Sequence, residues 1–147
     1  MQTPMIKILV GLFACLAIVA AAPVVAEEED DHRLDDAWQH AIGDQEPVLT
    51  EKQFALLNNL AFQVAATKVC DGFTLDGEKF SVGFTEATSP LPPNLTDEDV
   101  THWKKAVLIR FGTSYGILLA EGNAEEAAFC ENAEEMKADA EVPHVWQ

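Results

Sequence analysis

The side chains best suited to bind a metal ion lie near the start of the chain. His32 stands between Asp31 and Asp35, and His40 follows in the next stretch. Carboxylate oxygens combined with imidazole nitrogens are suitable ligands for divalent cations. The sequence therefore predicts a weak cation site made by Asp31, His32, Asp35 and His40. The alternative is an acidic segment whose side chains are only solvated.

Other arrangements that carry out chemistry are missing from the sequence. There is no H-E-x-x-H, no G-x-S-x-G, no glycine-rich phosphate loop and no C-x-x-C-H haem motif. The 4 histidines are far apart, and His102 on a predicted helix has the pattern of a surface residue. We therefore predict no catalytic residue, no cofactor and no enzymatic activity, unless the fold assembles groups that the sequence hides.

Residues 1–26 have the pattern of a secretory signal peptide. Lys7 precedes an apolar run, and Val24 and Ala26 are small residues placed before a cut at Ala26/Glu27. One alternative is an uncleaved anchor, because residues 8–25 are just long enough to span a bilayer. Another is a lipoprotein attached through Cys15. Cleavage predicts a periplasmic or secreted protein without a membrane segment.

The cysteine pattern changes if the signal peptide is removed. Of the 3 cysteines, Cys70 and Cys130 remain, and an even number in an exported chain favours a disulfide. A redox-active or metal-binding pair is the alternative, but the two thiols are far apart and no C-x-x-C is present. The sequence therefore predicts a structural Cys70–Cys130 bridge.

The charge of the chain limits its partners. Its 25 acidic residues outnumber 9 basic ones, and the formal net charge is −16. Such a surface repels phosphate backbones and anionic lipids, so nucleic acid is excluded as a partner. Cations, basic peptides and basic proteins are attracted instead.

The elements that must position any site are predicted to be helices. Residues 50–70 are almost free of charge, with a capping box at Thr50 and Gln53 and a stop at Asp71-Gly72. Apolar residues cover most of this helix, including Ala55 and Leu60, so other elements must surround it. The predicted fold is all-α, a small bundle of four to five helices around this central helix.

The remaining segments are assigned from the same signals. Residues 27–36 are an acidic leader expected to be disordered, and residues 37–139 form a single helical domain. Residues 140–147 are expected to be a loosely attached tail, with the alternative that its Val145 and Trp146 fold back onto the domain. Residues 73–84 fit a helix beginning at Asp76 or, alternatively, a β-hairpin around Asp76-Gly77. We choose the helix, because no other strand is available to extend a hairpin.

Two further helices are predicted in the second half. One begins at a Thr96–Asp99 capping box and runs to about residue 120, and the other begins at Asn123 as its cap. Gly112 and Gly116 lie on one face of the first and would let another helix approach closely. With Trp38, Trp103 and Tyr115, they form the candidate surface for a partner or ligand.

Several of these features occur together in a known kind of protein. They are a helix ending in Cys70-Asp71-Gly72-Phe73, a helix start at Leu75-Asp76, and a helix with Gly112 and Gly116 that is followed by Phe129-Cys130-Glu131-Asn132-Ala133. With them, the chain resembles small, exported, uncharacterised proteobacterial proteins. The resemblance implies an all-α periplasmic domain with one disulfide, and it implies no activity.

Three functions are compatible with the sequence. The first is a non-enzymatic exported domain that binds an unknown protein or small ligand in a groove between helices. The second is an acid-stress chaperone of the periplasm, whose carboxylates lose charge on acidification and expose apolar faces. The third is weak divalent-cation binding by the acidic, histidine-containing leader.

Overall fold

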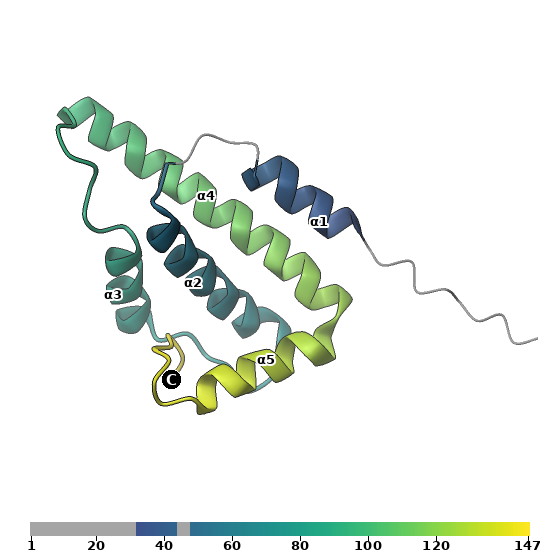
Figure 1. Cartoon of the computed structure of the whole chain (residues 1–147). Coiled ribbons are helices and arrows are strands. Elements are labelled where there is room, and N and C mark those ends of the chain that lie inside the picture. Colours follow the sequence, from purple (N-terminus) through teal and green to yellow (C-terminus); the bar gives the residue numbers. More distant parts are fainter. Residues whose placement is uncertain (1–31, 44–47) are drawn as a thin grey trace, which may run out of the picture.

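The central helix has neighbours along its sides and across one end (Figure 1). The computed structural model describes residues 32–43 and 48–147. In it, α2 (Glu51–Val69) contacts α3 (Gly77–Ala87), α4 (Asp97–Ala124) and α5 (Glu126–Ala138). The first helix, α1 (His32–Trp38), continues into a π-helical turn, η1 (Gln39–Gly43), and packs on the side of α4 away from α3. The all-helical prediction is confirmed.

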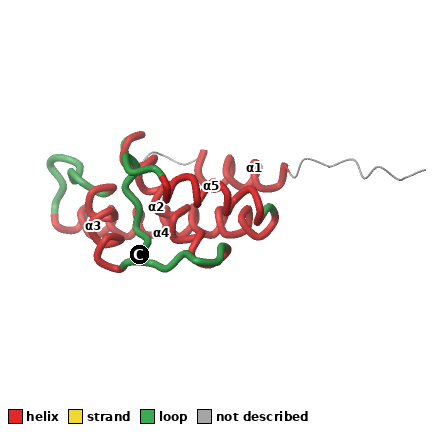
Figure 2. The backbone as a smooth tube through the Cα atoms, turned by 90° about the horizontal axis from the view of Figure 1, so that it is seen from below, coloured by secondary structure: helices red, strands yellow, loops and turns green. Residues whose placement is uncertain are grey.

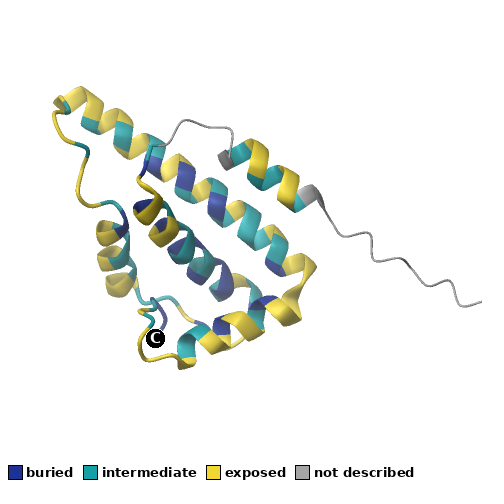
Figure 3. Ribbon diagram, viewed as in Figure 1, coloured by how far each residue is buried: buried dark blue, intermediate teal, exposed yellow. Residues whose placement is uncertain are grey.

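The arrangement is shallow. Figure 2, which looks at the molecule from below, shows the helices as a slab that is wider than it is deep. A shallow slab cannot surround each helix completely, and Figure 3 shows exposed positions along α3, α4 and α5. Uncovered helix faces are therefore a property of this fold.

The start and end of α2 follow the local signals. The Thr50 hydroxyl accepts a hydrogen bond from the Gln53 backbone N–H at 3.2 Å, and Gln53 Oε1 accepts one from the Thr50 N–H at 3.0 Å. Beyond its last turn, Gly72 takes a left-handed φ of +82°, which glycine adopts without strain. Fewer than half of the apolar side chains of α2 are fully buried, and Ala55 and Leu56 are exposed. The apolar surface of this helix is thus only partly covered.

The disulfide joins α2 to α5. Cys70 and Cys130 are bonded, with their Cα atoms 5.5 Å apart, so the predicted bridge is confirmed. One buried cluster surrounds it, and its members come from both helices, from the loop after α2 and from the C-terminal segment: Ala65, Ala66, Cys70, Phe73, Phe129, Ala133 and Trp146.

A second buried cluster fills the space between α2, α3 and α4. Its centre consists of Leu49, Leu57, Ala87 and Val107. The rings of Phe80, Phe84 and Phe111 pack beside it, with centroids 5.7 to 6.0 Å apart. These aromatic contacts attach α3 to α4.

Residues 73–84 form a loop and a helix, so the hairpin alternative is wrong. The Asp76 carboxylate accepts hydrogen bonds from the N–H groups of Glu78 and Lys79 at 3.0 and 3.1 Å, which caps α3. In the described part of the chain, extended pairing is limited to one isolated bridge between Leu75 and Trp146.

The boundary between the last two helices is a correction. We expected Asn123 to cap the final helix, but α4 continues through it to Ala124, and Asn123 donates its side-chain amide to the Leu119 carbonyl at 2.6 Å. Glu125 occupies the cap position of α5 without a side-chain cap bond. The reason lies at Gly122, where an added Cβ would lie 3.0 Å from both Val69 and the Phe129 ring. Glycine serves here for close packing, not as a helix stop.

The two ends of the domain also differ from expectation. Helix α1 begins at His32, within the stretch for which we expected disorder. The C-terminal tail is firmly attached, because Val145 is 5% exposed and Trp146 is 0% exposed. Of the two possibilities for the tail, the structure shows the folded-back one.

A candidate binding groove between α2 and α3

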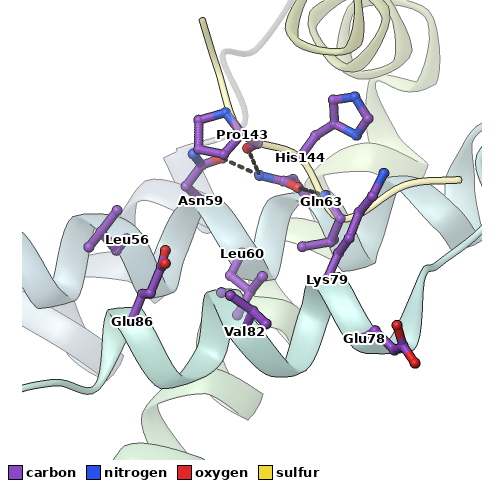
Figure 4. A pocket seen from close by; sticks show the side chains of 12 residues that line it. Leu56, Asn59, Leu60, Gln63, Glu78, Lys79, Val82, Glu86, Pro143 and His144 are labelled. Carbon is purple, nitrogen blue, oxygen red and sulfur yellow. Dashed lines mark hydrogen bonds between the residues drawn. The ribbon is translucent and has the colours of Figure 1, made fainter. Parts of the chain in front are cut away.

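A trough runs between α2 and α3 and ends under the C-terminal tail (Figure 4). It encloses about 460 Å³. The side chains that line it come from three segments: Leu56, Asn59, Leu60 and Gln63 from α2, Glu78, Lys79, Val82 and Glu86 from α3, and Pro143, His144 and Val145 from the tail. Gly83 completes the lining. The three segments are distant in sequence, so only the folded chain forms this trough.

The trough continues into a second hollow. This hollow encloses about 820 Å³ and shares Leu56 and Glu86 with the first. Its far wall is the proline-rich loop after α3, which contributes Leu91 and Pro92. Together the two hollows form one groove, from the tail to the proline loop, which we call the α2–α3 groove.

Helical spacing explains why these side chains face each other. On α2, positions 56, 59, 60 and 63 share one face, and on α3 positions 79, 82, 83 and 86 do the same. Gly83 allows the two helices to approach, because an added Cβ there would lie 3.4 Å from the Leu60 side chain. A wider side chain on α3 would push this wall of the groove outward.

The apolar groups of the groove are unusually exposed. Large hydrophobic residues on the surface of the described chain include Leu56 at 39%, Val82 at 59% and Leu91 at 44%, and all three line the groove. Scattered single apolar residues on a surface need no explanation, but several that line adjoining hollows are typical of an interaction site. The groove therefore has the composition of a binding surface.

Gln63 closes one end of the groove by holding the tail. Its Oε1 accepts a hydrogen bond from the Val145 N–H at 2.7 Å, and its Nε2 donates to Asn59 Oδ1 and to the Pro143 carbonyl, both at 3.3 Å. Its backbone carbonyl accepts the Trp146 indole N–H at 2.9 Å. Figure 4 shows these side-chain bonds converging on the amide. Because both polar atoms of the buried Gln63 amide form hydrogen bonds, this side chain fixes the position of the tail.

Backbone hydrogen bonds hold the tail in an extended form. The Asp76 N–H donates to the Val145 carbonyl at 2.8 Å, and the Gln147 N–H donates to the Thr74 carbonyl at 3.0 Å. The Lys79 ammonium group donates to the Trp146 carbonyl at 2.7 Å. The loop before α3 thus binds the extended C-terminal tail through backbone hydrogen bonds, in the way that the edge of a sheet binds an added strand.

The groove carries charges of both signs on its rims. Its lining includes two lysines and two glutamates, Lys52, Lys79, Glu78 and Glu86, of which only Lys52 lies outside α3. Beside them, the His144 ring stacks on Trp146 with centroids 5.4 Å apart, and its Nδ1 atom is buried without a hydrogen-bond partner. The lining thus combines apolar side chains with a few polar and charged groups, a composition that can orient an apolar ligand.

Two carboxyl groups with perturbed pKa values lie on α4, outside the groove. Hydrogen bonds from the Thr96 side chain and backbone lower the pKa of Asp99 below its usual value. Burial raises the pKa of Glu121, and repulsion by Glu125 and Asp35 raises it further. Perturbed carboxyl groups at a site can indicate catalysis, but these two belong to helix ends.

The three aromatic candidates have separate structural roles. Trp38 is half-buried and lines a third hollow with Asn58 and Phe62. Trp103 donates its indole N–H to the Val48 carbonyl at 3.0 Å and packs on the second cluster. Tyr115 packs, half-buried, on the cluster around the disulfide. The structure does not bring them together.

The glycine pair also differs from expectation. Gly112 and Gly116 are exposed, and no atom of the described chain lies within 4 Å of a Cβ built on either. The predicted close approach of another helix of this chain is therefore wrong for both. Close contact occurs instead at Gly83 and Gly122.

Only part of the predicted metal site lies within the described residues. Asp31 and the side chain of His32 lie outside the described residues, as do residues 1–26 with the predicted signal peptide. Asp35 and His40 are exposed on α1 and η1. In the portion that the structure describes, no group of three or more histidine, cysteine, aspartate or glutamate side chains is arranged to hold an ion.

Sequence reasoning missed the residues that form the groove. Gln63 was visible as a polar residue in an apolar helix, which is a signal for a buried hydrogen-bonding role. Leu56 and Val82 gave no such signal, because an apolar residue that lies off the core stripe of its helix is common on protein surfaces and does not by itself indicate a binding site.

Within residues 32–43 and 48–147, no helix is long and apolar enough to cross a membrane. Comparison of the chain with models of protein families, with curated proteins and with solved structures finds no match.

Proposed function

We propose that the protein is a non-enzymatic binding protein of an exported compartment, and that its α2–α3 groove takes an apolar segment of a partner protein. The observation that carries this proposal is the row of exposed Leu56, Val82 and Leu91 along one groove. Covering these three side chains removes apolar surface from water at about 25 cal/mol per Å². A partner segment with matching apolar side chains gains this energy.

The shape of the groove favours a chain segment over a compact small molecule. Small-molecule sites are usually enclosed, whereas this groove is open and extends over two joined hollows. The loop before α3 already holds the extended C-terminal tail at one end of the groove by backbone hydrogen bonds. A partner segment placed in line with the tail would lie along the helical walls, where it is held by burial of apolar side chains.

The charge of the chain adds a preference for the partner. With a formal net charge of −16, the protein attracts cationic partners over a range set by ionic strength. We therefore infer that the bound segment is apolar in the middle and carries lysine or arginine at its ends. The Glu78 and Glu86 carboxylates at the groove rim are the nearest acceptors for them.

The disulfide and the predicted signal peptide support an exported location. A bond between Cys70 and Cys130 persists in oxidising surroundings such as the periplasm or the extracellular space. The proposal therefore places the interaction outside the cytoplasm.

A site-specific cross-link tests this function. A photo-reactive amino acid at Val82 is introduced into the protein in its native host, and the cross-linked segment is sequenced by mass spectrometry. That segment is then synthesised, and its affinity is measured by fluorescence anisotropy at low and high salt. We expect Val82→Asp to weaken binding by about tenfold or more, since it places an unpaired charge against apolar surface.

Ser81 provides the matched control, because it is exposed on the same helix but does not line the groove. The photo-reactive group at Ser81 should give no adduct with that segment, and Ser81→Asp should leave its affinity unchanged. Equal labelling from both positions, or a peptide affinity insensitive to Val82→Asp, would show that the groove is not the binding site.

A further inference from the structure

A second group of exposed large hydrophobic residues lies away from the groove, on the outer face of α4. Leu108 is 59% exposed and Ile109 is 70% exposed. The opposite face of the same helix packs into the protein through Val107, Arg110 and Ser114, which are buried. The outer face of α4 therefore presents apolar surface to which no described element of this chain is attached.

The residues of this outer face repeat with heptad spacing. They are Lys105, Ile109, Gly112, Gly116, Leu119 and Asn123, separated alternately by four and three positions. This is the spacing that keeps one stripe of a helix against a partner helix in a coiled coil. All six are exposed except Leu119, which is half-buried. We call this stripe the α4 seam.

The residues of the α4 seam are arranged symmetrically about the middle of the seam. Around a midpoint near Ser114, Gly112 corresponds to Gly116, Ile109 to Leu119, and Lys105 to Asn123. An antiparallel pair of identical helices sets such positions opposite one another. Glycine would then meet glycine at the centre, and an apolar pair would flank it on each side.

Neither glycine of the seam is needed within a single chain. Both lie inside a long helix, where glycine is less stable than alanine, and each has open space where a Cβ would stand. Neither has a positive φ. Because glycine has no side chain, these two positions would allow the backbone of another helix to approach the outer face closely.

The charges along α4 distinguish the possible directions of pairing. Between Asp99 and Glu121 the helix has no acidic residue, although the chain has 25. Lys104 and Lys105 lie in its first half, whereas Glu125 and Glu126 follow its end. An antiparallel pair puts the lysines of one copy near the glutamates of the other, and a parallel pair puts like charges together.

We propose that the α4 seam is the contact between two copies of this chain, which pair antiparallel about a twofold axis near Ser114. The interface is isologous, because each copy offers the same surface to the other. Only one helix from each copy takes part, so the buried area is at the low end for specific interfaces. We expect a dissociation constant on the order of 10 μM. This contact shares no residue with the α2–α3 groove, and its test is independent of the proposed function.

Sedimentation equilibrium of the protein as the cell processes it, from roughly 1 μM to 1 mM, measures the dimer. Gly116→Glu is the informative variant, because glutamate favours the helix while it places like charges at the centre of the seam. We expect its dissociation constant to rise about tenfold or more, with no loss of thermal stability of the monomer. Gly77→Glu adds the same charge at another glycine with open space and is the matched control.

A charge exchange tests the direction of the helices. Lys105→Glu should weaken the dimer, Glu126→Lys should weaken it as well, and the double variant should restore it. A protein that stays monomeric at the highest concentration would overturn the proposal and leave the seam to a different partner. Three other results would also overturn the proposal. The dimer could tolerate Gly116→Glu, Gly77→Glu could weaken it equally, or the double charge variant could fail to restore it.

Discussion

Truncation of Trp146 to alanine is the sharpest test of how this domain is held together. The Trp146 side chain is 0% exposed, and its ring contacts Phe73 edge-on with centroids 4.7 Å apart. Its indole N–H donates to the Gln63 carbonyl at 2.9 Å. One residue of the tail thus joins the loop after α2, the central helix and the disulfide cluster.

The expected loss of stability is large. Removal of a buried tryptophan side chain costs about 3–5 kcal/mol, since apolar contacts are lost and a cavity remains. For a domain of this size, 1 kcal/mol corresponds to about 4 °C in the melting temperature, so Trp146→Ala should lower it by about 12–20 °C. Trp146→Phe keeps an aromatic ring but loses the hydrogen bond, and it should cost about 1–2 kcal/mol.

Urea unfolding followed by far-ultraviolet circular dichroism measures both variants, because this signal does not depend on tryptophan. Trp38→Ala is the matched control, since Trp38 is only half-buried on the outlying α1. Its free energy of unfolding should fall by less than that of Trp146→Ala. A loss below about 1 kcal/mol for Trp146→Ala would refute the reasoning, because it would mean that the tail is not part of the core.

Three further predictions concern the covalent and ionic contacts. Reduction of the Cys70–Cys130 bond, which spans 60 residues, should lower the free energy of unfolding by about 4 kcal/mol, as measured in urea with and without dithiothreitol. Glu121→Gln should raise the melting temperature at pH 7 but not at pH 3. Burial raises the pKa of Glu121 in the folded protein, so its protonated form favours folding at low pH. This contribution to stability is lost as the pH rises through the pKa of the folded state. The Thr96 hydrogen bonds lower the pKa of Asp99, so its contribution to stability is present above the unfolded pKa and lost as the pH falls through the folded one. Thr96→Ala should therefore be less stable than the parent at pH 7, and the two melting temperatures should approach each other at pH 2.

The parts of the fold that depend on neighbouring residues could be predicted from the sequence. The Thr50–Gln53 and Thr96–Asp99 capping boxes both form, because each needs only a hydroxyl and a side-chain oxygen three positions apart. The disulfide was predictable for a different reason, since only two cysteines remain after the predicted cleavage.

The features that depend on distant contacts were not predictable. The Trp146 indole bonds to Gln63, 83 residues away, and no local pattern indicates such a pair. At Gly122 the local rule suggests a helix end, but contact with Val69 and Phe129 keeps the backbone helical. Tertiary packing overrides the local preference in both places.

The groove shows a limit of periodicity itself. Periodic apolar residues indicate that a helix face is apolar, but not whether another element covers it. Val82 lies on the side of α3 away from Phe80 and Phe84, and Leu56 lies beside the buried stripe of α2, and they are exposed at 59% and 39%. Only the three-dimensional positions of α2, α3 and the tail distinguish a core from a groove.

The shallow shape of the domain connects the two surfaces proposed for binding. Figure 3 shows exposed positions along both α3 and α4. Val82 on α3 and Ile109 on α4 are exposed at 59% and 70%, so no described element covers them. Pairing through the α4 seam would cover one face and leave the α2–α3 groove of each copy open. A dimer would then carry two grooves, and a partner with two apolar segments would bind it more tightly than it binds a monomer.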